Sequence, residues 1–197
     1  DDLKDYTLWV EAENRRLSEI FVQQEDERRQ MEGGKAEAAA VREIHALLVQ
    51  GGGPEAPIRR VLRAAREAAG SRRTVVALLD PRRNELSHRF ADGDITPGFL
   101  EGFRFPLSED GVLAAVVRSG QAIHVFDRLM PYFRRLLSGR ESRVIDAPSF
   151  VVLPVVRGSE PLGILYADRA EGDEPFRDGE VETLSSLADL VSLSLRG

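Results

Sequence analysis

A hairpin signal in the last quarter of the sequence constrains the fold of this chain most strongly. Residues 149–168 read SFVVLPVVRGSEPLGILYAD, so two apolar, β-branched runs flank a polar segment that contains Gly158. Glycine supplies the backbone freedom that a tight turn needs, and the pattern therefore predicts a β-hairpin. Pro154 stands within the first run. Because proline cannot donate a hydrogen bond to a neighbouring strand, it predicts an edge or bulged position.

The composition is that of a globular protein, and it excludes several classes of function. The 197 residues carry a net charge of −6 and no cysteine. This charge argues against a nucleic-acid-binding face, and the lack of cysteine excludes disulfides, thiolate catalysis and cysteine-based zinc sites. No apolar run reaches the roughly 20 residues of a membrane span and no signal peptide is visible, so we expect a cytoplasmic protein. Because residue 1 is Asp, we expect a fragment of a longer polypeptide.

A long charged helix is predicted over residues 3–31. Val10 and Leu17 share one heptad position and Ile20 occupies the other, which fits a coiled coil imperfectly. The alternative is a solvated helix that packs one stripe against its own domain. The pair Gly33-Gly34 is expected to break or kink this helix. We therefore divide the chain into a helical linker or coiled-coil stalk at 1–34 and a folded domain at 35–197.

The folded domain combines short strands with amphipathic helices. Further strands are expected at 74–79, 86–91 and 122–126, and helices at 58–69, 112–118, 127–137 and 176–195, with a polar loop at 138–147. Pro131 is expected to interrupt the third of these helices. Strand pairs bracketed by helices, without regular βαβ alternation, indicate an α+β fold with a largely antiparallel sheet of five or six strands.

Four stretches follow one another in the folded domain: TVVALLDPRRNELSHRF, FPLSEDGVLAAVVRSGQAIHVFD, the hairpin with Pro154 and Gly163, and PFRDGEVETLSSLADLVSLSL. In their order and spacing they resemble a GAF domain. The resemblance covers roughly residues 41–195. It implies a five- to six-stranded antiparallel sheet with the terminal helices packed on one face, preceded here by a long N-terminal helix. The stretches DRLMPYFRRLL and PLGILYADR are also similar to GAF domains attached to HDOD modules in bacterial signalling proteins.

The resemblance also implies a small-molecule pocket on the sheet face away from the terminal helices. The sequence requires no cofactor or metal, and the identity of any ligand stays open. A chain without cysteine lacks the attachment site of a bilin and the thiols of the methionine-sulfoxide reductases among the relatives. His124 could be a ligand to haem or to a metal ion. The alternative is a histidine that forms a hydrogen bond with the backbone. The residues expected to line or cover the pocket are Phe105, Val112, His124, Phe126, Tyr132, Arg134, Ser149 and Val151.

Two places in the sequence are candidates for binding an anionic ligand. The guanidinium of Arg134 beside Tyr132 matches a carboxylate or phosphate, although a surface helix with solvated arginines is the alternative. Asp110 is expected to cap the helix that begins near Val112, and the alternative is a helix N-terminus that attracts an anionic ligand.

The closing helix predicts a partner. Val181, Leu184, Ala188, Val191 and Leu195 form one apolar stripe, and a second surface follows from the leucines near the end of the helix. One stripe can cover the sheet, so the other needs the N-terminal helix or a second subunit. We expect a twofold homodimer, with the candidate interface residues Val10, Leu17, Ile20, Leu187, Leu190 and Leu193.

These observations predict a non-catalytic regulatory or sensory domain of a bacterial cytoplasmic signalling protein, with a neighbouring signalling domain and a candidate small-molecule ligand. The sequence contains neither a phosphate-binding P-loop nor a His-Glu-x-x-His zinc motif. One alternative is a ligand-free dimerisation and docking scaffold whose pocket is filled by its own aromatic side chains. A weaker alternative is a haem or redox sensor. Neither nucleic acid nor a membrane is expected as a partner.

Overall fold

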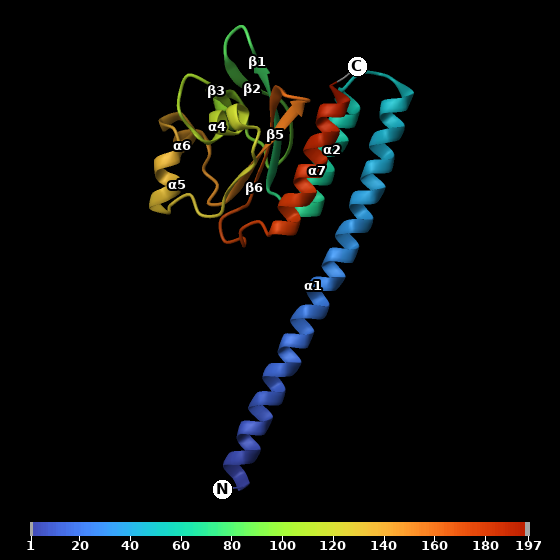
Figure 1. Cartoon of the computed structure of the whole chain (residues 1–197), viewed down its shortest axis with the longest axis vertical. Coiled ribbons are helices and arrows are strands. Elements are labelled where there is room, and N and C mark those ends of the chain that lie inside the picture. The colour runs from blue at the N-terminus through green and yellow to red at the C-terminus, as the bar shows by residue number, and fades with distance from the viewer. Residues whose placement is uncertain (1, 196–197) are drawn as a thin grey trace. The chain divides into compact units, whose positions relative to one another are not determined.

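The computed structural model describes residues 2–195, except for the side chains of 2–14, 17, 21, 25–26, 28–33 and 36 within helix α1 (Asp2–Gln50). The chain divides by its contacts into two units, Asp1–Ala38 and Ala39–Gly197. Helix α1 contributes to both (Figure 1). It runs without interruption across Gly33-Gly34, so the predicted break there is wrong. The strong helix formers that follow, KAEAAA, offset a cost of about 1 kcal/mol for each glycine.

The second unit is built around a six-stranded sheet in which all neighbouring strands are antiparallel, in the order β3-β2-β1-β6-β5-β4. This arrangement confirms the predicted α+β fold with an antiparallel sheet. The strands are β1 Arg73–Asp80, β2 Glu85–Gly93, β3 Arg104–Pro106, β4 Ile123–Val125, β5 Phe150–Arg157 and β6 Glu160–Asp168.

The predicted hairpin is formed by β5 and β6. Gly158 at φ +60° provides the left-handed position of the turn between Arg157 and Glu160, which pair with each other. Pro154 lies beyond the short β4, which pairs only with residues 150–152, so the predicted edge position is confirmed. Gly163 in β6 lies so close to β1 that an added Cβ would be 2.1 Å from the Ala77 carbonyl oxygen. This close approach explains the glycine within the strand.

The terminal helices cover one face of the sheet, as predicted (Figure 1). Helices α2 (Glu55–Ala69) and α7 (Asp178–Ser194) pack against each other; α2 contacts β1 and β2, and α7 contacts β5 and β6. Their apolar side chains form a first core with Val151 and other residues of the sheet, and Ala40 and Ile44 at the end of α1 join it.

This packing changes the interpretation of the closing helix. Leu187 and Leu190 are only 1% and 7% exposed, because α7 packs on α2 within the unit. They belong to the first core and cannot at the same time face a second subunit, while Leu193 is half-buried. The proposed interface residues Val10 and Leu17 lie outside the described side chains, and Ile20 is exposed.

The other face of the sheet carries a second core beneath short helices and loops. Pro131 begins a helix at the first position, where its missing N–H is not needed, and does not interrupt one. The polar stretch predicted as a loop contains a helix whose start is fixed by a capping box between Ser138 and Glu141. The helices here are α3 Pro97–Gly102, α4 Val112–Ser119, α5 Pro131–Leu136 and α6 Gly139–Val144.

Candidate functional site

The second core contains a group of aromatic rings on the sheet face where the pocket is expected. The ring centroid of Phe103 lies 5.0 Å from Phe105, 5.3 Å from Phe99 and 5.3 Å from Tyr166. Phe150 lies 5.7 Å from Tyr166. Phe103 meets Phe105 and Tyr166 edge to face, and the other two pairs are tilted. An edge-to-face pair adds about 0.5–1.5 kcal/mol beyond burial. These five residues, the aromatic cluster, are at most 7% exposed, so the protein's own side chains occupy the space beside the sheet.

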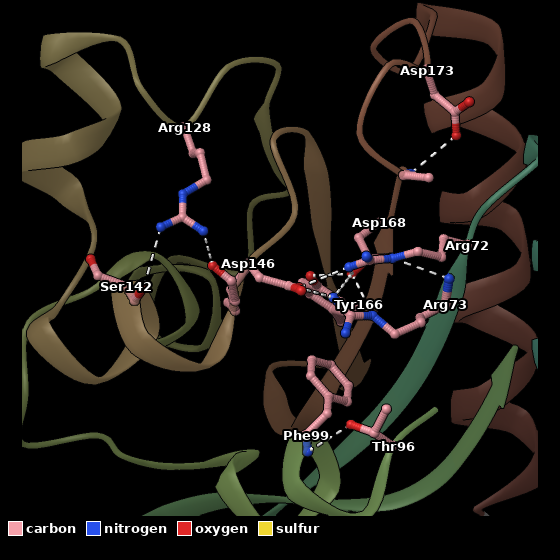
Figure 2. Close-up of polar contacts among 12 residues, drawn as sticks. Arg72, Arg73, Thr96, Phe99, Arg128, Ser142, Asp146, Tyr166, Asp168 and Asp173 are labelled. Carbon is pink, nitrogen blue, oxygen red and sulfur yellow. Dashed lines mark hydrogen bonds and ion pairs between the residues drawn. The ribbon is translucent and has the colours of Figure 1, made fainter. Parts of the chain in front are cut away.

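A buried carboxylate lies next to this cluster. Asp168, the last residue of β6, is fully buried and accepts hydrogen bonds from the Tyr166 hydroxyl at 2.8 Å and from Arg73 Nε at 2.8 Å. The backbone N–H of Arg73 also donates to it at 3.1 Å. A buried charge is stable only when it is paired and hydrogen-bonded, and these donors meet that requirement (Figure 2).

Two arginines at the start of β1 complete an ionic group with two carboxylates. Arg73 contacts Asp168 and Asp146 through Nη2, and its guanidinium lies 3.8 Å from the ring centroid of Phe99. Arg72 Nη2 lies 2.8 Å from Asp146 and 3.4 Å from Asp168. We call Arg72, Arg73, Asp146 and Asp168 the arginine–aspartate cluster (Figure 2). The two positive charges of the arginines offset the two negative charges of the aspartates.

The two carboxylates of this cluster differ in their exposure. Asp168 is 0% exposed at its side chain, whereas Asp146, in the segment between α6 and β5, is 65% exposed. Burial alone would raise the pKa of Asp146, but the hydrogen bonds and charges of Arg73 and Arg72 lower it below the usual value. Burial and the nearby Asp168 raise the pKa of the Tyr166 hydroxyl well above its usual value. The hydroxyl therefore acts as a donor to Asp168.

A second buried carboxylate occupies the N-terminus of α4. Glu141 of α6 is 2% exposed, and its side chain accepts from the backbone N–H groups of Val112 at 3.1 Å and Leu113 at 2.7 Å. It also accepts from the N–H of Ser138 at 2.7 Å. Asp110, the predicted cap, instead pairs with Arg118 at 2.9 Å. The anion-attracting end of this helix is therefore filled by a side chain of the same protein.

The structure brings together only part of the predicted pocket. Phe105 and Val112 lie buried in the second core, as expected. Val151 belongs to the first core on the opposite face. His124 of β4 lies directly beside Val151 of β5 in the register of the two strands, so its side chain shares that face. The placement of these two residues is wrong because β5 is buried on both faces, so its alternation does not show which face is which.

The remaining predicted residues lie outside the aromatic cluster. The hydroxyl of Ser149 is buried without a hydrogen-bond partner in the described structure. Phe126, Tyr132 and Arg134 are exposed around α5. Burial lowers the pKa of His124, although the charges of Asp178 and Glu180 oppose this shift. Among the described residues, no group of three His, Asp or Glu side chains could hold a metal ion.

Comparison with known proteins identifies the fold family. A family model of the GAF domain matches residues 54–195. The chain belongs to the GAF domain family. GAF domains are in general sensory or regulatory, and this assignment confirms the resemblance seen in the sequence. Attachment to an HDOD module stays a prediction, and no curated protein matches the chain significantly.

Solved structures share the fold at low sequence identity. The GAF domain of a phosphoenolpyruvate-protein phosphotransferase from Coxiella burnetii has a TM-score of 0.68 and 20% identity, over 84% of this chain and 94% of that one. The equivalent domain from Acinetobacter has a TM-score of 0.65 and 17% identity, over 82% and 90%. A free methionine-R-sulfoxide reductase from Neisseria meningitidis has a TM-score of 0.61 and 20% identity, over 82% and 90%.

Proposed function

We propose that this GAF domain is a non-catalytic regulatory domain that relays a signal through protein contacts and holds no diffusible ligand in its resting state. The aromatic cluster carries the proposal. Five rings that are at most 7% exposed occupy the sheet face on which the family resemblance implies a pocket. A ligand entering there would have to displace rings whose edge contacts and burial stabilise the fold.

The polar groups near this face support the same conclusion. The donors at the N-terminus of α4 bind Glu141, and the donors at the start of β1 bind Asp168 and Asp146. Groups that would otherwise attract a carboxylate or phosphate are thus satisfied internally. The chain also has no cysteine, so it offers no thiol for a redox reaction of the kind named for its reductase neighbours.

A thermal-shift screen tests this proposal. Linkage requires that any ligand bound to the folded state alone raises the melting temperature. We expect no saturable shift with cyclic nucleotides, 2-oxo acids, amino acids or haem. In each protein the shift is measured against its own melting temperature without ligand. A saturable increase in the melting temperature of the native chain that disappears in Phe105→Ala would contradict the proposal.

A second candidate function is sensing of a small anion, and the exposure of Asp146 favours it. This carboxylate is 65% exposed and bridges Arg72 and Arg73, so a ligand carboxylate or phosphate would compete for the same donors. In this case inorganic phosphate or a 2-oxo acid would stabilise Asp146→Asn more than the native chain. Equal responses of the two proteins would remove this candidate.

A further inference from the structure

Exposed apolar side chains gather around α5. Eight large hydrophobic residues of the described structure are exposed, and five of them fall within residues 126–136. Their exposed fractions run from 38% to 69%. We call them the α5 patch; they are Phe126, Leu129, Met130, Tyr132 and Leu136. Single exposed apolar residues are ordinary, but a contiguous group marks an interaction surface.

Two aromatic rings of the α5 patch pack on a buried ring of the second core. Phe133 of α5 is 6% exposed and belongs to the second core. The ring centroids of Phe126 and Tyr132 lie 4.9 Å and 5.2 Å from that of Phe133, both in edge-to-face geometry. Two exposed rings thus flank one buried ring. Aromatic anchors held in this way lose little conformational entropy on binding.

The segment that carries the patch is positively charged. Residues 126–136 contain three arginines and one carboxylate, in a chain of net charge −6. Arg134 and Arg135 are exposed, and neither forms an ion pair with a carboxylate in the described part of the chain. Aromatic residues, methionine and arginine are the types enriched in protein interfaces. The charge favours an acidic partner and disfavours a twofold contact between two copies, which would bring like charges together.

We propose that the α5 patch binds an acidic amphipathic segment of a partner protein, whose apolar side chains cover Phe126 and Tyr132 while its carboxylates pair with Arg134 and Arg135. This proposal rests on the function proposed above, since it names the chemistry of the partner through which the signal passes. The negative charge of the remaining chain repels such a segment elsewhere and directs it to this surface.

Fluorescence anisotropy with two synthetic peptides tests the patch. Both peptides are amphipathic, about 15 residues long and carry the same leucine and phenylalanine face, but one has glutamate and the other lysine on its polar face. The full chain should bind the acidic peptide at least about tenfold more tightly, and added salt should weaken that binding. Equal affinities for the two peptides would overturn the proposal.

Matched variants assign the binding to this surface. The double change Arg134→Glu with Arg135→Glu should remove or reverse the preference for the acidic peptide, and Tyr132→Ser should lower its affinity at least about fivefold. The control is Arg82→Glu with Arg83→Glu, a pair that is exposed in the turn between β1 and β2 and should leave binding unchanged. A loss of binding in the control variant as large as in the test variant would contradict the proposal.

Two further measurements separate other occupants of the same surface. Sedimentation of the native chain and of the double variant Arg134→Glu with Arg135→Glu measures self-association. If the native chain self-associates and the double variant does not, the patch binds a second copy and the proposal is overturned. Co-sedimentation with phosphatidylserine vesicles measures membrane binding. If the vesicles bind the chain through the same arginines and the acidic peptide does not bind, the patch binds a membrane and the proposal is overturned. Because neither depends on a diffusible ligand, the patch is tested independently of the ligand screen.

Discussion

At the level of single residues, Asp168 is a fully buried carboxylate that several donors hold in place. The change Asp168→Asn removes its charge with little change of shape and leaves Arg73, which is 4% exposed, without its buried partner. Breaking one side of a buried ion pair costs about 3–5 kcal/mol. We expect the free energy of unfolding, measured by urea denaturation, to fall by about this amount. Asp94→Asn, at an exposed position, is the control and should change it by less than about 0.5 kcal/mol.

Asp146 predicts a pH dependence of stability. Its pKa is lower in the folded chain than the usual 3.8, because Arg73 and Arg72 favour the charged form over the opposing effect of burial. The carboxylate therefore stabilises the fold above its usual pKa, and this contribution is lost as the pH falls through the folded value.

The variant Asp146→Asn isolates this contribution. It should unfold at lower urea concentration than the native chain at neutral pH, and the difference should shrink as the pH falls below about 4. Because the side chain is 65% exposed, solvent screening keeps the effect small. A difference that stays constant from neutral to acidic pH would show that the lost contact is not ionic.

The sequence predicts single residues well where the local pattern decides their environment. Pro154 and Gly158 were placed correctly, because a missing donor and a left-handed turn are properties of the residue itself. The arginine–aspartate cluster was missed because Arg73 and Asp168 are separated by 95 positions and meet only through the pairing of β1 with β6. Two adjacent arginines before an apolar strand were the available signal, since buried arginines require carboxylate partners.

At the level of elements, α6 fixes the start of α4. The carboxylate of Glu141 accepts from the N–H groups of Val112 and Leu113, and from Ser138 in its own capping box. In Glu141→Gln one oxygen becomes an amide donor that faces these donors. We expect a loss of about 1–3 kcal/mol in unfolding free energy and faster hydrogen exchange at Val112 and Leu113.

Two observations separate this role from a general loss of stability. Glu101→Gln, at an exposed position of α3, should leave the exchange at the α4 N-terminus unchanged. Unaltered protection of Val112 and Leu113 in Glu141→Gln would show that the carboxylate does not hold this helix end.

The predicted elements were correct where a periodic pattern extends over several residues. The strands at 74–79 and 86–91 and the helix at 58–69 correspond to β1, β2 and α2. Helix α6 is only six residues long, too short for a periodic apolar stripe, although Ser138 and Glu141 have the spacing of a capping box. The face of Val151 was misassigned because continuous burial removes the alternation that would reveal it.

At the level of the whole molecule, packing within the chain moves the expected dimer interface away from α7. A charged substitution at Leu190 would destabilise the first core, because this residue is 7% exposed and packed there. The described part of α1 offers exposed apolar side chains instead, at Ile20 and Val22. The predicted heptad places Ile20 on the seam of a coiled coil and Val22 on the outside. No helix of the described structure is long and apolar enough to cross a membrane.

These two residues provide a matched test of dimerisation. If α1 forms a two-stranded coiled coil, Ile20→Glu should raise the dissociation constant of the dimer at least about tenfold, because it places two like charges in the seam. Val22→Glu introduces the same charge two residues away, outside the seam, and should have little effect. Sedimentation equilibrium of the full chain over a range of concentrations measures both constants. A monomeric native chain, or equal effects of the two substitutions, would show that this heptad does not join two subunits.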